Sequence, residues 1–293
     1  MRILLFGKNG QLGWELRRTL APLGEVFSYD YPEVDLSVEQ SLRQVIRHVQ
    51  PEVIVNAAAY TAVDRAESEG ERAISVNALA PGIMAQEAQT LGAALVHFST
   101  DYVFDGSKNS PYLESDPPNP LGVYGRSKLE GERAVEQISS AYVILRTSWV
   151  YSLRGDSFVN KILQWSRQQP TLRVVDDQIG NPTWARMLAE ITAQMLAMGG
   201  GEVVNWTAER GGLYHLAGSG NTSRLEWARA ILRYDPKKEE QITRDILPAH
   251  TIDFPTPAQR PLFSALNCER FTQVFGMCLP GWEDTLRLAM EAG

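Results

Sequence analysis

The sequence is poor in cysteine and histidine, and its N-terminal apolar run is short. The 293 residues include two cysteines, Cys268 and Cys278, and four histidines. Two cysteines give no disulfide framework, and neither they nor the scattered histidines show metal-ligand spacing, so we expect reduced thiols and no metal site. The run 3–6 is followed at once by glycines. It is therefore neither a signal sequence nor a membrane span.

Positive charge is also scarce, because the chain carries a formal net charge of -7. Nucleic acid and anionic membrane surfaces are bound by basic faces, so we expect neither as a partner. The content of 44% hydrophobic and 22% charged residues is ordinary for a globular protein with a substantial core. We expect a cytoplasmic protein with one large domain or two unequal ones.

Short apolar runs alternate with amphipathic stretches in the first half of the chain. The sequence predicts strands at 3–6, 26–29, 53–56, 94–99 and 143–147. This β-α-β alternation is typical of a parallel sheet with helices on both faces. The expected fold is α/β, with a Rossmann-type doubly wound parallel sheet in residues 1–150. Residues 151–293 would mainly form a smaller C-terminal α/β substrate-binding lobe.

Helical periodicity connects the predicted strands. Leu42, Val45, Ile46 and Val49 follow the spacing of a buried helix face, and Ser37 with Gln40 has the pattern of a capping box before them. Another helix, at 77–91, would stop at Gly92. Later elements are predicted as helices at 158–168 and 184–198 and strands at 172–175 and 213–217. The last strand is expected to return to the first lobe, within a segment near 213–230.

A glycine-rich turn lies directly between the first strand and a helical run at 14–20. Gly7 permits the tight turn, Gly10 lets the backbone approach a pyrophosphate, and Gly13 allows close packing of helix on strand. The helix N-terminus adds free amides and the positive end of a dipole. We predict that NADPH or NADH binds here. The other residues assigned to this loop are Asn9, Gln11 and Leu12.

Asp30 ends the second predicted strand, where it can accept hydrogen bonds from the adenosine ribose. This placement favours NADH, although an exposed strand-end carboxylate without a ligand is the alternative. Lys8 could offset the repulsion between the Asp30 carboxylate and a 2′-phosphate, so NADPH stays an alternative cofactor. The remaining residues expected to flank the adenine or to let the backbone pass close to the dinucleotide are Asp35, Leu36, Ala57, Ala58, Ala59 and Tyr60.

Tyr124 and Lys128 are four residues apart, which places both on one face of a helix. A phenol has a pKa of about 10, and a nearby ammonium lowers it, so Tyr124 could exchange a proton with a sugar hydroxyl or carbonyl. Thr100, at a strand end, offers a second hydrogen-bond donor. The spacing alone also fits an ordinary contact on an exposed helix.

A second pair with the same spacing, Tyr234 and Lys238, serves as a comparison. It contains Pro236 and lies in a charge-rich stretch, which disfavours a regular helix there. We interpret this second pair as incidental.

Together these motifs resemble an extended short-chain dehydrogenase/reductase, and longer runs are similar to the dTDP-4-dehydrorhamnose reductase family. Those runs are 99–106, 123–128, 146–151, 177–183 and 255–261. The resemblance implies hydride transfer to C4 of dTDP-4-dehydro-6-deoxy-L-mannose, giving dTDP-L-rhamnose. Tyr124 would protonate the forming alkoxide, and Thr100 would hydrogen-bond the same oxygen. Lys128 would bind the nicotinamide ribose and lower the pKa of the phenol.

The resemblance also implies residues that bind the dTDP-sugar. Trp149 would stack on the sugar, and Arg260 would pair with the diphosphate through its planar guanidinium. The alternatives are a core tryptophan and a surface ion pair. The other residues assigned to the substrate are Asp101 beside the catalytic threonine, and Asn181 and Thr183 near the thymidine.

The residue after Asp101 separates reduction from dehydration. Sugar-nucleotide 4,6-dehydratases have a glutamate there, because elimination of water needs a carboxylate base, and this chain has Tyr102. The sequence therefore favours simple carbonyl reduction. Three alternatives stay open: a reductase giving the C4 epimer, 6-deoxy-L-talose; an NAD-dependent epimerase; and a non-catalytic subunit like that of methionine adenosyltransferase.

Some members of the family place glutamates at a metal-bridged dimer contact. Glu15 is present here, but Arg186 stands where another glutamate is expected. We therefore assign no metal and keep a homodimer open, with an ion pair between Glu15 and Arg186 as a replacement for the metal.

Overall fold

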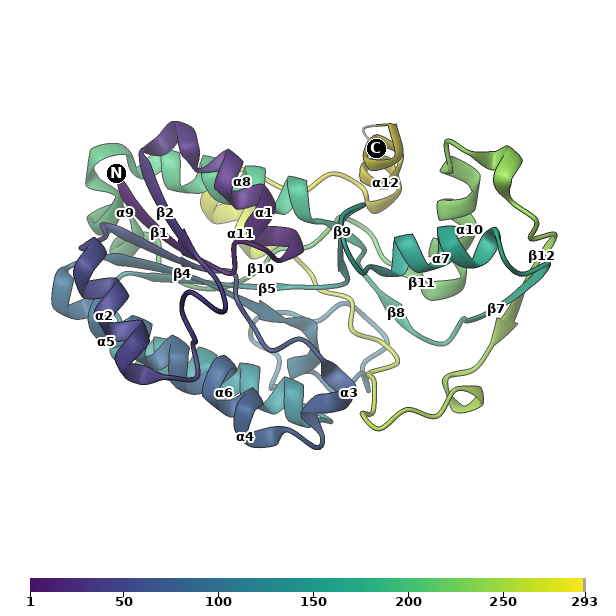
Figure 1. Cartoon of the computed structure of the whole chain (residues 1–293), viewed down its shortest axis with the longest axis horizontal. Helices are drawn as coiled ribbons and strands as arrows, with labels where there is room; N and C mark the ends of the chain where they lie inside the picture. Colours follow the sequence, from purple (N-terminus) through teal and green to yellow (C-terminus); the bar gives the residue numbers. More distant parts are fainter. Residues whose placement is uncertain (292–293) are drawn as a thin grey trace.

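The computed structural model describes residues 1–291 and has two lobes of unequal size (Figure 1). The large lobe contains a six-stranded sheet in the order β10-β5-β4-β3-β1-β2, with all neighbours parallel. Its strands are β1 (Arg2–Phe6), β2 (Glu25–Tyr29), β3 (Val53–Asn56), β4 (Ala94–Thr100), β5 (Tyr142–Thr147) and β10 (Gly212–His215). The predicted α/β class and the five strands of the first half are confirmed.

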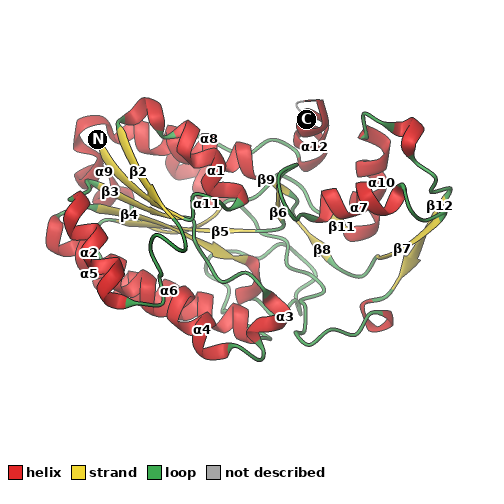
Figure 2. Ribbon diagram, in the orientation of Figure 1, coloured by secondary structure: helices red, strands yellow, loops and turns green. Residues whose placement is uncertain are grey.

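Side chains alternate across β1 and so give the sheet two buried faces. Ile3 and Leu5 pack with α1 (Gln11–Thr19) and α8 (Ala185–Gly199) on one face. Leu4 and Phe6 pack on the other face, which is covered by α2 (Glu39–Val49), α5 (Ala80–Leu91) and α6 (Val123–Ile138). Helices on both faces explain why these strands are apolar throughout (Figure 2).

The second half of the chain divides between the lobes. β10 pairs with β5, so the predicted return to the first lobe is confirmed. The segments before and after it return as well, because α9 (Val203–Arg210) contacts β4 and β5, and α11 (Glu269–Phe275) contacts β10. Together with α8, these helices belong to the large lobe although they lie beyond residue 150.

The small lobe packs around Trp227 and Tyr151, each at most 1% exposed. Its helices are α7 (Phe158–Ser166), α10 (Arg224–Tyr234) and α12 (Trp282–Glu291). Its paired strands are β7 (Thr171–Val175) with β12 (Asp245–Ala249), β8 (Ile179–Gly180) with β11 (Thr222–Ser223), and β6 (Val150–Tyr151) with β9 (Thr183–Trp184). Two further short helices, α3 (Val63–Ala66) and α4 (Gly70–Ile74), belong to the large lobe.

Two predicted helix starts were wrong. α2 begins at Glu39 without a side-chain cap, because the Ser37 hydroxyl donates to Asp35 Oδ1 at 2.6 Å instead of forming a capping box. The helix expected from residue 77 begins as α5 at Ala80, after a π-helical turn over Ser75–Leu79. Its predicted stop at Gly92 is confirmed by a left-handed φ of 66°.

Candidate active site

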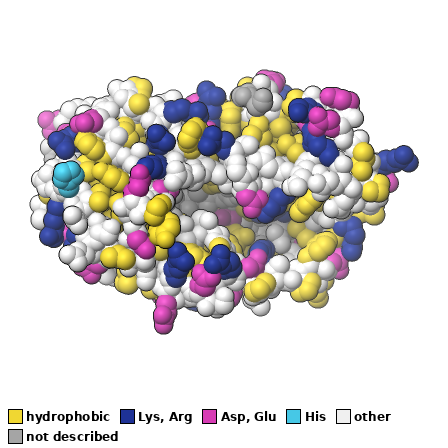
Figure 3. All heavy atoms as spheres, in the orientation of Figure 1, with side chains coloured by type: hydrophobic (Ala, Val, Ile, Leu, Met, Phe, Trp, Pro, Cys, Tyr) yellow, Lys and Arg dark blue, Asp and Glu magenta, His cyan; other side chains and the backbone are white. Residues whose placement is uncertain are grey.

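A cavity of about 550 Å³ lies at the carboxyl ends of the parallel strands, where the large lobe meets the small one. Gly7 follows β1, Ala57 follows β3, Thr100 ends β4 and Thr147 ends β5; all four line it. Figure 3 shows the molecule hollowed near the middle of this face. Open α/β sheets bind their ligands at this position.

The loop from Gly7 to Gly13 has the shape that a pyrophosphate needs. Gly7 has a φ of +90°, and a Cβ there would lie 2.7 Å from Ala58 N, while a Cβ on Gly13 would collide with Gly7 O. A Cβ on Gly10 would lie 3.4 Å from Gly7 O, an ordinary contact. Gln11 Oε1 and Thr147 Oγ1 line the same cavity and are buried without a hydrogen-bond partner among residues 1–291. The loop and these free polar atoms fit a bound dinucleotide.

Asp30 lines the cavity, but its carboxylate already has backbone partners. Oδ2 accepts from Asn9 N at 2.9 Å, and Oδ1 accepts from Tyr31 N at 2.8 Å. Lys8, which was expected to offset a 2′-phosphate, forms an ion pair with Glu33 at 2.5 Å. Asp30 therefore shapes the loop in addition to facing the cavity.

A side cavity of about 160 Å³ continues from the loop, with a size and shape suited to a flat ring. Asp35, Leu36 and Tyr60 line it, as the sequence predicted, together with Ala58 and Ala59. The structure adds Arg72, on α4. Sequence reasoning missed Arg72, because the sequence of a short helix does not show which of its side chains faces a strand end that is distant in the chain.

Tyr124, Lys128 and Thr100 are brought together in the main cavity, as the sequence predicted. The first turns of α6 carry Tyr124 and Lys128, and two glycines seat this helix. A Cβ on Gly125 would collide with Tyr102 O, and one on Gly131 would collide with Asn77 O. Backbone contact therefore fixes the distance of α6 from the strand end that carries Thr100.

The expected effect of Lys128 on Tyr124 is wrong for this arrangement. Lys128 Nζ donates to Phe98 O at 2.7 Å and lies 3.2 Å from His97 Nε2. Burial raises the pKa of the Tyr124 phenol. A hydrogen bond with the neighbouring Thr100 hydroxyl lowers this pKa, but by less than burial raises it. Burial also lowers the pKa of Lys128 to about 8. Tyr124 is consequently protonated at neutral pH.

Asp101 lies buried between the two lobes. Its carboxylate accepts from Thr100 Oγ1 at 3.1 Å, from Ser148 Oγ at 3.0 Å and from Ser264 Oγ at 2.5 Å. Burial raises its pKa, while these hydrogen bonds lower it. Asp101 lines the cavity as predicted, but its hydrogen bonds join the ends of β4 and β5 to the C-terminal loop.

Trp149 lines the cavity in a strained conformation, with a φ of +45°. Its ring packs against Gly180, where a Cβ would come within 2.5 Å. The Arg224 Cζ lies 3.6 Å from the centroid of this ring, and Trp227 stacks behind it. The strain, the glycine and the two flanking side chains together hold the ring in one orientation.

Arg224 takes the place in the cavity that the sequence assigned to Arg260. Arg260 does not line the cavity, because it pairs with both oxygens of Asp64 at 3.0 and 2.7 Å. Arg224 lines it, and burial lowers the pKa of its guanidinium to about 10. One sequence signal was available: Arg224 opens a helix, where a cation opposes the helix dipole.

Asn181 and Thr183 are not brought to the cavity wall. The Asn181 side chain donates to Gly218 O and Gly220 O and accepts from Leu266 N. Thr183 Oγ1 donates to Asn181 O and accepts from Gly218 N. Both side chains are buried and join loops within the protein.

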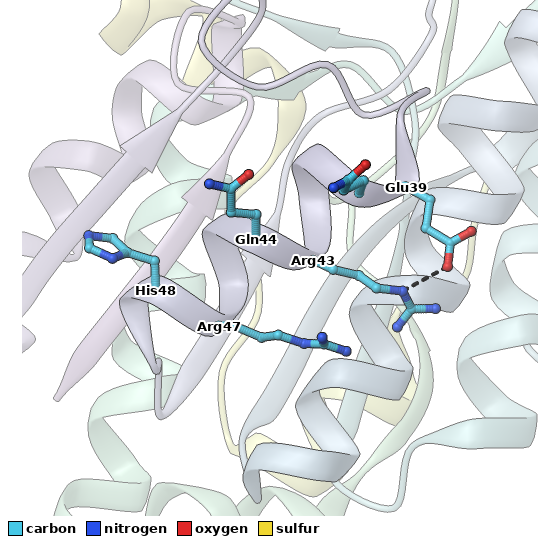
Figure 4. Close-up of a pocket in the computed structure, with 6 residues that line it drawn as sticks. Glu39, Arg43, Gln44, Arg47 and His48 are labelled. Atoms are coloured by element: carbon cyan, nitrogen blue, oxygen red, sulfur yellow. Dashed lines mark hydrogen bonds and ion pairs between the residues drawn. The ribbon is translucent and has the colours of Figure 1, made fainter.

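The outer face of α2 carries a shallow hollow lined by Arg43, Arg47 and their neighbours (Figure 4). Arg43 pairs with Glu39, and both arginines pair with Glu87 of α5 at 2.7 Å. These charges hold α2 on α5, so the hollow is an ion-pair cluster rather than a ligand site.

The expected ion pair between Glu15 and Arg186 does not form within the chain. Glu15 pairs with Arg18, and Arg186 pairs with Glu190 at 2.9 Å. Residues 1–291 contain no group of three His, Cys, Asp or Glu side chains arranged for a metal ion. Over the same residues, no helix is both long and apolar enough to cross a bilayer.

Known proteins match this sequence over nearly its full length. The family model described as RmlD substrate binding domain matches residues 1–292. The chain is 42% identical to a dTDP-4-dehydrorhamnose reductase of Burkholderia thailandensis over 294 residues, covering 99% of this chain and 98% of the relative.

Two solved structures are similar as well. The crystal structure of a dTDP-4-dehydrorhamnose reductase from Clostridium acetobutylicum has a TM-score of 0.91 and 32% identity, covering 100% of this chain and 99% of the other. The dTDP-4-dehydrorhamnose reductase from Bacillus anthracis in complex with NADP has a TM-score of 0.89 and 32% identity, with the same coverage.

Proposed function

This chain belongs to the RmlD substrate binding domain family, and from that membership we propose that it is a dTDP-4-dehydrorhamnose reductase. It reduces the C4 ketone of dTDP-4-dehydro-6-deoxy-L-mannose to dTDP-L-rhamnose with NADPH or NADH. The observation that carries the proposal is the meeting of Tyr124, Thr100 and Lys128 in one cavity with the glycine loop.

When bound, the dinucleotide would supply the hydride. The residues of the chain stabilise the negative charge that develops on the carbonyl oxygen and donate the proton. As the carbonyl oxygen becomes negative, Tyr124 donates its phenolic proton to it. The raised pKa of Tyr124 keeps the phenol protonated across neutral pH, so it carries the proton to be donated. Thr100 lies beside Tyr124 and is placed to hydrogen-bond the same oxygen, which stabilises the transition state more than the ground state.

Substrate binding is assigned to the residues at the edge of the small lobe. Arg224 offers a planar guanidinium to the diphosphate, and Trp149 lines the cavity next to it, where its indole would contact the sugar. On the cofactor side, the loop from Gly7 to Gly13 would hold the pyrophosphate, and Lys128 would bind the nicotinamide ribose. The side cavity lined by Leu36 and Tyr60 would receive the adenine.

A turnover assay tests the proposal. Adding dTDP-4-dehydro-6-deoxy-L-mannose to the chain with NADPH or NADH should lower the absorbance of the reduced nicotinamide. NMR of the product should give the rhamnose configuration at C4, whereas 6-deoxy-L-talose would identify the sister reductase. Full activity in Tyr124→Phe would refute the assigned chemistry.

The proposal includes a cytoplasmic location and a homodimer. Cys268 and Cys278 are free thiols, as expected in a reducing compartment. Sedimentation velocity tests the oligomeric state, because a 32.6 kDa monomer sediments more slowly than its dimer.

A further inference from the structure

A buried chain of polar groups joins the cofactor loop to Lys128, and two of its members have no role in the mechanism above. Asn56 ends β3, His97 lies beside it on β4, and Lys128 lies on α6; none is more than 1% exposed. Asn56 Nδ2 lies 3.0 Å from His97 Nδ1. His97 Nε2 lies 3.2 Å from Lys128 Nζ.

The cofactor loop determines which way the Asn56 amide faces. Ala58 N donates to Asn56 Oδ1 at 3.1 Å, so the Asn56 oxygen faces Ala58 and its amino group faces His97. An amino group only donates, and His97 Nδ1 must therefore accept. A neutral imidazole that accepts at one nitrogen carries its proton on the other. His97 consequently presents its Nε2–H to Lys128.

That N–H requires an acceptor, and the atom it meets is Lys128 Nζ. An ammonium has no lone pair, whereas a neutral amine can accept from His97 Nε2 and donate to Phe98 O at 2.7 Å. Burial acts in the same direction, because it lowers the pKa of Lys128 to about 8, so that the neutral amine predominates above pH 8, and it holds the pKa of His97 well below 6.5. Glu132, one turn further along α6, favours the ammonium, but both of its oxygens accept from Arg146 of β5.

We propose that His97 is a positioning residue that holds Lys128 as a neutral amine in the unliganded protein, and that Asn56 sets this state by fixing the tautomer of His97. The inference deepens the proposed function, on which it rests, because it concerns the same lysine. To form the ammonium, the proton on His97 Nε2 passes to Lys128 and one proton from water binds His97 Nδ1. Asn56 must then turn its oxygen toward His97, and Ala58 N loses its acceptor.

The proposal couples the charge of Lys128 to the loop that contains Ala58. Ala58 lines the dinucleotide cavity. The charge of Lys128 is thus linked to the backbone that contacts the cofactor, through two side chains that touch neither substrate nor cofactor.

His215 provides an internal reference with the opposite tautomer. Its Nδ1 lies 3.0 Å from Tyr112 O, and a carbonyl only accepts, so the proton of His215 is on Nδ1. Among residues 1–291, its buried Nε2 has no hydrogen-bond partner. Burial lowers the pKa of His215 to about 3, so it stays neutral at pH 7.

¹⁵N NMR of the unliganded protein, labelled at the histidine nitrogens, tests the proposal at pH 9, where a lysine with a pKa of about 8 is mainly the neutral amine. The Nε2 of His97 should have the shift of a protonated nitrogen and its Nδ1 that of an unprotonated one, and His215 should show the reverse. The variants His97→Gln and His215→Asn identify the two sets of signals. A wild-type His97 with its proton on Nδ1 would overturn the proposal.

Asn56→Asp is the matched variant, because a carboxylate can accept from both Ala58 N and His97 Nδ1. His97 should then adopt the tautomer of His215, and the titration midpoint of Lys128, followed by ¹³Cε NMR, should rise by at least one pH unit. An unchanged tautomer or midpoint in this variant would contradict the proposal. These spectra need no turnover, so an inactive chain with the expected spectra would refute the proposed function alone.

Discussion

The guanidinium of Arg224 lies over the indole of Trp149, with its Cζ 3.6 Å from the ring centroid. Trp149 lies between β5 and β6, and Arg224 is the first residue of α10, so the contact joins two segments that are distant in the sequence. Both residues line the cavity, and Arg224 carries a planar guanidinium there. It thus presents N–H donors in a fixed plane, which suits two oxygens of a diphosphate.

Replacing Arg224 with methionine should raise the KM for the sugar nucleotide about 10- to 100-fold, since a charged hydrogen bond contributes roughly 1.5–3 kcal/mol. Arg260→Met is the control, because Arg260 is occupied by Asp64. Steady-state kinetics of both variants checks this. A larger rise in KM for Arg260→Met than for Arg224→Met would indicate that Arg260 binds the diphosphate.

Tyr124→Phe should lower kcat about 10²- to 10⁴-fold, the range for loss of a general acid. The dissociation constant for NADPH should change little, because the ring remains in place. Stopped-flow kinetics and fluorescence titration measure the two quantities separately. A large loss of cofactor affinity with kcat preserved would make Tyr124 a binding residue rather than the proton donor.

Gly180→Ala should raise the KM for the sugar nucleotide, because the added Cβ would come within 2.5 Å of the Trp149 ring and displace it. Gly201→Ala is the matched control, since a Cβ there meets nothing within 4 Å. Kinetics and tryptophan fluorescence of the two variants check the expectation. Equal behaviour of both would show that the ring position does not matter.

Asp30→Ala should weaken the binding of NADH and NADPH alike. The Asp30 carboxylate holds Asn9 N and Tyr31 N, so its loss loosens the loop for both dinucleotides. Isothermal titration calorimetry with each cofactor distinguishes this from a ribose contact. A loss confined to NADH would support the ribose contact expected from the sequence.

Stability should fall as the pH drops below about 6.5. His215 has a folded pKa of about 3, well under the ordinary unfolded value near 6.5, so the unfolded state binds the proton first. Its contribution is complete above pH 6.5 and is lost progressively between pH 6.5 and 3. Between pH 6.5 and 5 the loss is about 1.5–2 kcal/mol.

The variant His215→Asn isolates this contribution, because an amide N–H can replace Nδ1–H as the donor to Tyr112 O. Urea unfolding at pH 6.5 and 5 should show a smaller drop in the free energy of unfolding for the variant than for the wild type. An identical drop in the variant and the wild type would mean that another group causes the loss of stability between pH 6.5 and 5.

The sequence predicted best where one local rule determines the structure. The strands of the large sheet follow from apolar runs, and the dinucleotide loop follows from three glycines. Close contacts with Ala58 and Gly7 explain why no larger residue fits at Gly7 and Gly13. Tyr124 and Lys128 share a helix, so their spacing alone placed them on one face. The capping box at Ser37 failed because Asp35 competes for the same hydroxyl at shorter range.

Residues that depend on distant partners were harder to predict. Arg260 and Arg224 are both arginines in suitable segments, and only the position of Asp64 shows which one is already paired. Asn181 was assigned to the ligand from the family resemblance, but it binds backbone groups of loops nearly 40 and more than 80 residues away. The effect of Lys128 on Tyr124 was misjudged because burial, which spacing does not report, dominates both pKa values.

The two glycine contacts beneath α6 affect how this protein can change. Where backbone touches backbone, no side-chain substitution can slide the helix, so Tyr124 and Thr100 keep their separation in any variant that folds. The wall that carries Trp149 and Arg224 has no such constraint, because its geometry depends on side chains that can be exchanged. Laboratory evolution toward other sugar nucleotides should therefore accumulate substitutions in the small lobe and leave α6 untouched.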